Sequence, residues 1–176
     1  LADGRTTQVW QARDRDTGTD RAVKILTAAV LAEREVFLAA ARLQQQFSHP
    51  NLQACEVVHD GELAFAVLGR VARGDLTTQR GRPWARLVPV LAGIADALAV
   101  LHARGVVHRD LKPANVLVGD VGAPVLADFG LAAALGDTGA PRGGSPFSMS
   151  PQQLDGQPPA VADDVYGFGA LAYELL

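Results

Sequence analysis

The sequence has 176 residues, 48% of them hydrophobic, and a formal net charge of −3 at pH 7. This composition is that of a globular chain, either one large domain or two small lobes, and the negative charge argues against a nucleic-acid-binding surface. We expect no signal peptide at Leu1, and no apolar run of about 18 residues predicts a membrane-spanning helix. The single cysteine, Cys55, excludes an internal disulfide and is expected to be a buried, inert thiol in a reducing compartment. Both ends look cut, since the last residues before Leu176 lie inside an apolar helical pattern.

The first part of the sequence has the pattern of a small sheet with one helix. Residues 1–12 form a polar turn between two strand-like pieces, and residues 21–26 alternate as a strand that contains one lysine. Residues 28–47 are rich in Ala, Leu, Glu, Arg and Gln without Gly or Pro, which predicts one long helix. Residues 52–58 and 62–68 are two more strands, joined by an Asp-Gly turn that is typical of a hairpin.

The second part combines helical periodicity with one short hairpin. Pro83 follows a polar loop and suits the first position of a helix. The helix that follows is predicted to bury one apolar face, formed by Leu87, Val90, Leu91, Ile94, Leu98 and Leu101. Residues 116–118 and 125–127 predict a hairpin, and residues 165–176 predict a final helix.

Polar residues gather around this hairpin. It is preceded by His108-Arg109-Asp110-Leu111-Lys112-Pro113-Ala114-Asn115 and followed by Asp128-Phe129-Gly130. Asp110 and Asn115 lead into the first strand and Asp128 leaves the second, so folding brings these polar groups to one edge. Each of these residues alone would have an ordinary explanation: Asp110 and Asp128 as turn residues and Lys112 as a solvated charge. Together, at this spacing, they predict a catalytic loop.

This pair of motifs resembles the signature of protein kinases, and the resemblance extends along the whole sequence in order. It implies that Asp110 accepts the proton of a substrate hydroxyl, and that Asn115 and Asp128 hold Mg²⁺ at the phosphates. Oxygen ligands suit Mg²⁺, which keeps several waters and takes one or two carboxylates from protein. Lys112 is a point charge for the γ-phosphate, and a lysine there resembles Ser/Thr rather than Tyr kinases. Lys24 resembles the strand lysine that pairs the α- and β-phosphates and a helix glutamate.

The resemblance also implies an ATP site between the two parts of the sequence. Its nucleotide-binding residues are expected to be Gly4, Val9, Ala22, Lys24, Leu68, Gly69, Val71, Leu117 and Asp128. Leu68 corresponds to the gatekeeper, and the backbone of residues 69–71 is expected to meet the adenine edge. The glycine-rich loop departs from the family pattern, because Ala2 and Thr7 stand where the first and third glycine would be. Glycine matters there because backbone amides must approach the phosphates closely.

The sequence leaves open the helix partner of Lys24. Counting back from residues 49–51, which resemble the turn after this helix in the family, puts the partner near Ala40. Glu33 and Glu35 lie more than one turn earlier, and Glu35 is the better candidate if the helix carries an insertion. Otherwise the ion pair is absent. Both glutamates also fit an ordinary place in the first half of a helix, where the macrodipole favours carboxylates.

Residues 132–144 are Gly-rich and resemble the activation loop of the family. Arg109 would pair with a phosphate placed there, with Thr138 and Ser145 as candidate acceptors. Hydroxyl groups in loops more often only stabilise turns, so the sequence leaves open whether Thr138 or Ser145 is phosphorylated.

Residues 145–154 resemble the substrate-binding segment of the family, which ends in Ala-Pro-Glu. Gln152 replaces the glutamate of that motif. Asp164, at the start of the final helix, resembles the carboxylate that holds the backbone of the catalytic loop. The alternative for Asp164 is an ordinary carboxylate at a helix N-terminus.

These features predict an α+β, two-lobed fold of the protein-kinase kind. Residues 1–70 would form a small antiparallel sheet lobe with one helix, and residues 71–176 a mainly helical lobe without the family's last helices, αG to αI. The expected activity is transfer of the ATP γ-phosphoryl group to Ser or Thr hydroxyls of proteins, itself included, as in bacterial Ser/Thr kinases. ATP and Mg²⁺ are the expected cofactors.

The same resemblance gives expectations for partners and location. We expect protein substrates, self-association for autophosphorylation, and no nucleic-acid partner. The expected location is the cytoplasm, either free or as the cytoplasmic domain of a membrane-anchored protein, with no membrane segment inside this chain.

Two other functions stay open. A pseudokinase, the same fold kept as a nucleotide-sensitive binding module, is favoured by Ala2, Thr7 and the unplaced helix glutamate. A small-molecule phosphotransferase of the aminoglycoside-kinase kind shares the His-x-Asp and Asn loop. Lys112 and residues 145–152 speak against this second alternative.

Overall fold

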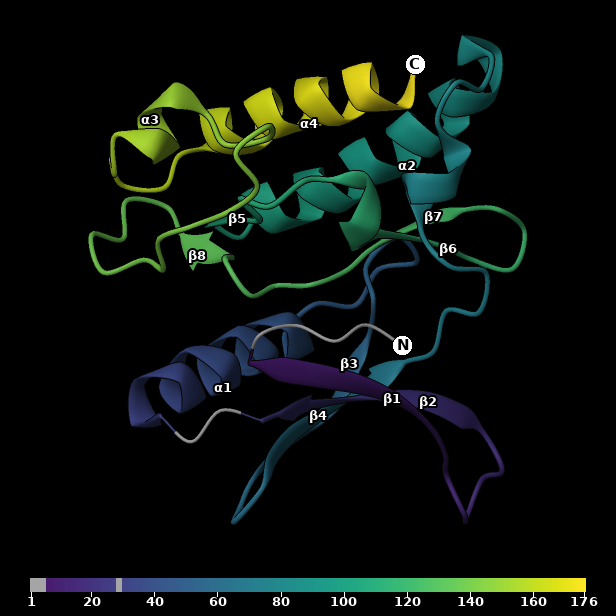
Figure 1. Cartoon of the computed structure of the whole chain (residues 1–176), viewed down its shortest axis with the longest axis vertical. Helices are drawn as coiled ribbons and strands as arrows, with labels where there is room; N and C mark the ends of the chain where they lie inside the picture. The colour runs from purple at the N-terminus through teal and green to yellow at the C-terminus, as the bar shows by residue number, and fades with distance from the viewer. Residues whose placement is uncertain (1–5, 28–29) are drawn as a thin grey trace.

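The computed structural model describes residues 6–27 and 30–176, which form a smaller and a larger lobe (Figure 1). The smaller lobe contains the helix α1 (Leu31–Gln45) and one antiparallel sheet with the strand order β1-β2-β4-β3. Its strands are β1 (Thr7–Arg13), β2 (Asp20–Leu26), β3 (Cys55–Asp60) and β4 (Ala64–Gly69). The predicted antiparallel sheet with one helix is therefore confirmed.

The larger lobe is built on two long helices, with short strands and turns at the side that faces the smaller lobe (Figure 1). The long helices are α2 (Trp84–His102) and α4 (Val161–Leu175). The other elements are η1 (Leu76–Gln79), β5 (Val106–Val107), η2 (Pro113–Asn115), β6 (Val116–Val118), β7 (Pro124–Leu126), β8 (Ala133–Ala134) and α3 (Pro151–Leu154). β6 pairs with β7 as the predicted hairpin, and β5 pairs with β8.

Helix α1 is held to the sheet by polar side chains along its length. Arg34 and Arg42 each donate from Nη2 to one carboxylate oxygen of Asp60, at 2.7 and 3.0 Å. Further along, Gln44 Nε2 donates to Gln53 O at 2.9 Å. The orientation of α1 is thus fixed by its contacts with β3 and the segment before that strand.

The core of the smaller lobe lies between α1 and one face of the sheet. Alternate side chains of β4 point into it, which follows from the two-residue period of a strand. Its buried members are Leu26, Phe37, Leu38, Ala41, Cys55, Ala64, Ala66 and Leu68. Cys55 is buried as predicted, and burial, with a smaller effect of Glu56, raises the pKa of its thiol to about 11.

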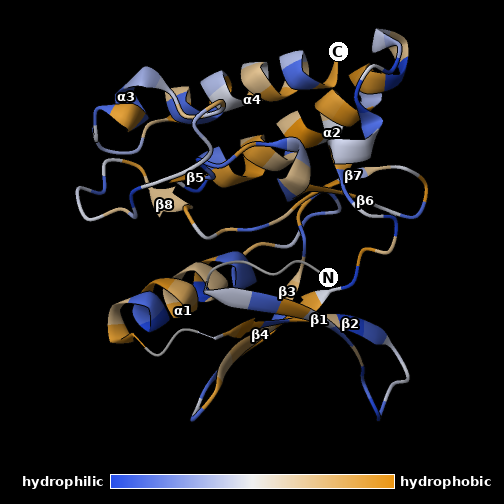
Figure 2. Ribbon diagram, viewed as in Figure 1, coloured by the Kyte–Doolittle hydropathy of each residue, from blue (hydrophilic) through white to orange (hydrophobic). Residues whose placement is uncertain are grey.

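Helix α2 is the central helix of the larger lobe, and Figure 2 shows apolar residues along much of it. Its buried face comprises Leu87, Val90, Ile94, Ala97, Leu98 and Leu101. These side chains belong to the core cluster that also includes residues of β6, β7 and α4. By length and composition α2 is also a candidate membrane-crossing helix, which was not expected from the sequence. The core helix of a soluble protein passes the same test, and one such helix does not establish a membrane span.

Gly93 lies where α2 passes closest to the hairpin. A Cβ at this position would be 2.6 Å from Pro124 Cγ and 3.0 Å from Asn51 Nδ2. Asn51 in turn donates from Nδ2 to Pro124 O at 2.7 Å, which holds the start of β7 to the turn before β3. A side chain at position 93 would therefore push the helix and the hairpin apart.

Several element boundaries differ from the sequence-based expectations. Pro83 is the residue before α2, because the helix begins at Trp84. Helix α4 begins at Val161 instead of residue 165, since Asp163 Oδ2 accepts a hydrogen bond from Ala160 N at 3.0 Å and starts the helix earlier. Asp164 consequently lies inside the first turn. The β5–β8 pair and the short helix α3 were not predicted from the sequence.

Candidate active site

The catalytic loop is held by one buried carboxylate of helix α4. Asp164 Oδ1 accepts from Arg109 N at 2.7 Å, and Oδ2 accepts from His108 N at 2.8 Å. His102 Nε2 lies 2.7 Å from the same Oδ2. Arg109 has a φ of 68°, which is uncommon for a residue other than glycine and costs free energy. The three contacts of Asp164 stabilise this strained backbone just before Asp110.

Burial alone would raise the pKa of Asp164. The pKa of Asp164 nevertheless lies below the ordinary value, because hydrogen bonds and nearby positive charge outweigh burial. These contributions come from the hydrogen bond of His102, the nearby His108 and the backbone N–H groups of Arg109 and His108. Asp164 is therefore an ionised group in the core of the larger lobe.

Asp110 is oriented by its own loop. Its Oδ2 accepts from Lys112 Nζ at 2.6 Å and from Asn115 Nδ2 at 2.7 Å. Asn115 Nδ2 also donates to the backbone oxygen of Asp110 at 2.9 Å. The other oxygen, Oδ1, accepts only a long hydrogen bond of 3.3 Å from Ser145 N in the described part of the chain. Oδ1 is thus the oxygen of Asp110 that remains available to a further donor.

Asn115 and Asp128 come together across the β6–β7 hairpin, as predicted from the sequence. Ala127 N donates to Asn115 O at 2.9 Å, which joins the start of one strand to the end of the other. Asp128 Oδ1 accepts from Lys24 Nζ at 2.8 Å and from Gly130 N at 3.2 Å. Within residues 6–27 and 30–176, neither Asn115 Oδ1 nor Asp128 Oδ2 accepts a hydrogen bond, so each residue keeps one oxygen for another ligand.

These two free oxygens fit the requirements of Mg²⁺, which prefers hard oxygen ligands. The residues that the structure describes contain no cluster of three His, Cys, Asp or Glu side chains that could hold a metal. A magnesium ion held by Asn115 and Asp128 would therefore take its remaining ligands from phosphate groups and water.

Asp128 carries its charge in a partly enclosed place between the lobes. Burial alone would raise its pKa, but the charge and hydrogen bond of Lys24, the N–H of Gly130 and the nearby His108 have the larger combined effect. The pKa of Asp128 therefore lies below the ordinary value. Its side chain is 43% exposed, so solvent in the cavity screens the ion pair with Lys24.

A cavity of about 570 Å³ lies between the lobes and contains most of the predicted nucleotide-binding residues. Those that line it are Val9, Ala22, Lys24, Leu68, Val71, Leu117 and Asp128, and the predicted magnesium ligand Asn115 lines it as well. Its volume is within the range of small-molecule sites. Thr7, which replaces the third glycine of the loop, also lines this cavity. Gly4 and Ala2 lie outside the described residues.

The connection between the lobes holds its first residue by two hydrogen bonds. Gly69 N donates to Ala54 O at 2.9 Å, and Gly69 O accepts from Gln53 Nε2 at 2.9 Å. Any contact of Gly69 with an adenine edge would thus use the second lone pair of its carbonyl oxygen. Val71 lines the cavity, and so does the buried Gln53.

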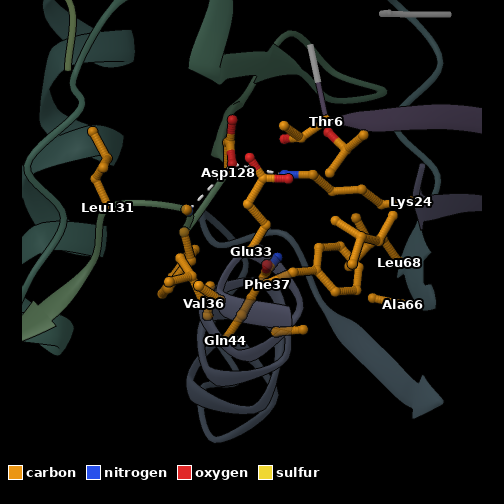
Figure 3. A pocket seen from close by; sticks show the side chains of 17 residues that line it. Thr6, Lys24, Glu33, Val36, Phe37, Gln44, Ala66, Leu68, Asp128 and Leu131 are labelled. Carbon is orange, nitrogen blue, oxygen red and sulfur yellow. Dashed lines mark hydrogen bonds and ion pairs between the residues drawn. The ribbon is translucent and has the colours of Figure 1, made fainter. Parts of the chain in front are cut away.

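A second cavity of about 470 Å³ lies between α1 and the lysine of β2 (Figure 3). Lys24, Leu68 and Asp128 line both cavities, so the two spaces meet at these side chains. Figure 3 shows the Glu33 side chain pointing from α1 toward Lys24 and Asp128. Glu35 is exposed and does not line either cavity.

The carboxylate that pairs with Lys24 in this structure is Asp128. In the described part of the chain no glutamate of α1 lies within 4.0 Å of Lys24 Nζ. Ala40, the position expected for the helix partner, lines the second cavity without a charge. The geometry thus favours Glu33 over Glu35 as a helix partner for Lys24, and it leaves the pair unmade in this conformation.

The expected activation loop packs against the catalytic loop. Arg109 Nη1 donates to Pro141 O at 2.9 Å, which joins the two loops directly. Thr138 is exposed. Ser145 is half-buried and reaches Asp110 through its backbone, as described above.

Residues 1–176 match the model of a known family, the protein kinase domain. The chain belongs to this family. It is 37% identical to the serine/threonine-protein kinase PkaA of Streptomyces coelicolor, over all of this chain and 37% of that protein. It is also 32% identical to PknA of Mycobacterium tuberculosis and 31% identical to PknB of Mycolicibacterium smegmatis, again over its whole length.

The predicted resemblance to bacterial Ser/Thr protein kinases, and with it the predicted α+β kinase fold, is confirmed by these matches. The chain spans 45% of PknA and 31% of PknB, which is less than half of each.

Two glutamines near the site had no role in the sequence-based prediction. Gln53 bonds to Gly69 at the lobe connection, as described above. In the substrate-binding segment, Gln152 was noted because it replaces a glutamate, but the structure places it on the surface. Its neighbour Gln153 is buried and contacts the catalytic loop. The Ser-Pro sequence before this pair, typical of a helix start, is the only signal that could have separated the two residues.

Proposed function

We propose that this protein transfers the γ-phosphoryl group of ATP to Ser or Thr hydroxyl groups of proteins, in a reaction that requires Mg²⁺. The observation that carries the proposal is the placement of Asp110. Lys112 and Asn115 both bind its Oδ2, and Oδ1 faces the segment that begins at Ser145. A scaffold that only bound nucleotide would not need a carboxylate oriented in this way.

In this mechanism, the nucleotide occupies the cavity of about 570 Å³, with its phosphates toward Lys24 and Asp128. Lys24 must then exchange its bond to Asp128 for phosphate oxygens, which leaves Asp128 Oδ1 with only the hydrogen bond from Gly130 N. When bound, Mg²⁺ neutralises charge on the phosphates, and Asn115 and Asp128 would hold it. Since little covalent chemistry falls to the protein, placement and electrostatics supply most of the rate.

The acceptor hydroxyl would approach Asp110 from the side of Oδ1. This oxygen accepts the hydroxyl proton as the new phosphate ester forms and the bond between the γ-phosphorus and the β–γ bridging oxygen breaks, so that ADP leaves. Lys112 keeps Oδ2 oriented and lies close enough to place its positive charge beside the transferred group.

The test is the transfer of labelled γ-phosphate from ATP to peptides that contain only Ser, only Thr or only Tyr as acceptor. The full-length protein is compared with Asp110→Asn and with Asp120→Asn, a matched control at an exposed turn. We expect label on Ser or Thr, at least about a hundredfold loss in Asp110→Asn, and no change in Asp120→Asn. Transfer that needs no Mg²⁺, or that survives Asp110→Asn, would contradict the mechanism.

Two outcomes correspond to the alternative functions. Nucleotide binding without any transfer would favour a pseudokinase. Label on aminoglycosides but not on peptides would favour a small-molecule phosphotransferase. We also propose self-association for autophosphorylation and a place in the cytoplasm, free or at a membrane anchor, from the family resemblance alone.

A further inference from the structure

The side chain of Gln153 joins two segments that are distant in sequence. It is 7% exposed and lies in the short helix α3. Its Nε2 donates to Arg109 O at 3.1 Å and to Gly143 O at 3.0 Å. One amide group thus bridges the catalytic loop and the segment before Ser145.

Both ends of this bridge lie next to groups of the proposed reaction. Arg109 directly precedes Asp110 and has the strained φ of 68°. Gly143 is two residues before Ser145, whose N–H reaches Asp110 Oδ1. Gly144, between them, passes so close that a Cβ there would be 3.2 Å from Gln153 Nε2. The amide therefore contributes, together with the hydrogen bond from Arg109 Nη1 to Pro141 O, to the distance between Asp110 and the segment beside its open oxygen.

The orientation of the amide is determined by the two carbonyl groups. Its own oxygen, Oε1, is buried and has no hydrogen-bond partner in the described part of the chain. A buried polar atom without a partner costs free energy. The side chain accepts this cost while both Nε2 donors are used, which indicates that the two carbonyls hold it in place.

Gln153 is itself fixed from helix α4. Its backbone N donates to Ser150 Oγ at 3.0 Å, and Ser150 Oγ donates to Asp163 Oδ1 at 2.5 Å. Asp163 is the neighbour of Asp164, which holds the catalytic loop. Two adjacent carboxylates of α4 thus support the two sides of the acceptor site, one directly and one through Ser150 and Gln153.

We propose that Gln153 is a positioning residue, which holds the acceptor-binding segment at a fixed distance from Asp110. This inference rests on the proposed phosphoryl transfer, and it assigns the role to Gln153 instead of the exposed Gln152. Loss of the bridge should weaken the productive binding of a peptide acceptor. It should leave nucleotide affinity unchanged, because Gln153 does not line the nucleotide cavity.

The test uses Gln153→Met, which keeps the length of the side chain and removes both donors, with Gln152→Met as the matched control. The acceptor is the best Ser or Thr peptide from the transfer assay. We expect kcat/KM for the peptide to fall about tenfold or more, mainly through KM, since two buried hydrogen bonds are lost. The Kd of the nucleotide should change less than about twofold, and Gln152→Met should behave as the wild type. A merely structural role would lower Tm without separating peptide KM from nucleotide Kd.

A second readout does not depend on activity. Arg142 is exposed and precedes Gly143, so trypsin cleavage after Arg142 reports how firmly the segment is held. We expect faster cleavage at Arg142 in Gln153→Met than in Gln152→Met. The milder Gln153→Asn, whose amide is too short to reach both carbonyls, should show the same effects in smaller size if Gln153→Met does not fold.

The outcomes separate this inference from the proposed function. Cleavage and kinetics equal to the wild type in Gln153→Met would overturn the role of Gln153. A parallel loss of nucleotide affinity would also overturn it, because the damage would then be general. If no protein transfers phosphate, the proposed function fails, while the cleavage rates still decide whether Gln153 holds the segment.

Discussion

Replacement of Asp164 by asparagine tests the carboxylate that supports the catalytic loop. In Asp164→Asn one of the two oxygens becomes an NH₂ group, which cannot accept a hydrogen bond. In one orientation the bond from Arg109 N is lost, and in the other the contacts of His108 N and His102 are lost. Either orientation leaves a buried N–H facing another donor.

The size of this effect follows from those contacts. A hydrogen bond to a charged group contributes about 1.5–3 kcal/mol, and a buried unsatisfied N–H adds a penalty of similar size. We therefore expect Asp164→Asn to lower the free energy of unfolding by about 3 kcal/mol and Tm by on the order of 10 °C. The assay is urea unfolding followed by circular dichroism, with Asp96→Asn, an exposed position of α2, as the control. A change below about 0.5 kcal/mol in Asp164→Asn would refute the reasoning.

The same variant gives a pH prediction. The pKa of Asp164 is lowered in the folded protein, so its contribution is fully present above the unfolded pKa of about 3.9. It is lost as the pH falls through the still lower folded pKa. The stability difference between the wild type and Asp164→Asn should thus be constant near neutral pH and shrink below about pH 4. A difference that grows on acidification would contradict the assignment of an ionised Asp164.

Three further predictions concern Lys24, its helix partner and the packing of α2. Glu33→Gln should lower kcat about tenfold, because Glu33 points toward Lys24. Glu35→Gln should change kcat by less than about twofold. Equal effects of the two variants in steady-state kinetics would exclude Glu33 as the helix partner of Lys24. Lys24→Met should lower kcat at saturating ATP by at least about a hundredfold, and a rate near the wild type would show that phosphate contacts lie elsewhere. Gly93→Ala should lower the free energy of unfolding by about 1–3 kcal/mol through the clash with the hairpin. In the control Gly169→Ala a Cβ would meet nothing within 4 Å, so this variant should be neutral or stabilising by up to about 1 kcal/mol. Similar urea midpoints for Gly93→Ala and Gly169→Ala would contradict the close packing of Gly93 against the hairpin.

Local patterns were sufficient for most of the helices and strands and for the polar groups of the β6–β7 hairpin, whereas the two-lobed fold was predicted from the family resemblance. The hairpin between Asn115 and Asp128 is short, so its strands had to bring the two residues to one edge. Lys24 could be found only through the resemblance of its strand to the lysine-bearing strand of protein kinases, because a lone lysine in a strand is usually a solvated edge residue. The contact between Asn115 and the segment of Asp128 depends on backbone geometry that a few neighbouring residues determine.

The contacts that were missed depend on which way a side chain faces after tertiary packing. Whether Gln152 or Gln153 turns inward is decided by the start of α3 at Ser150, which is anchored to α4. The partner of Lys24 depends on where α1 lies, and Asp60 fixes that through two arginines of the helix. Neither contact has a periodic signal in the sequence, because each joins segments whose distance is set by the whole fold.

The most direct test of the central claim is the γ-phosphoryl transfer reaction itself, measured at increasing Mg²⁺ concentration. The acceptors are two peptides that differ only in Ser or Ala at the acceptor position. The account predicts label on the Ser peptide alone, dependent on Mg²⁺ and lost in Asp110→Asn. Nucleotide binding of normal strength with no label on any Ser or Thr, in the full-length protein, would contradict it.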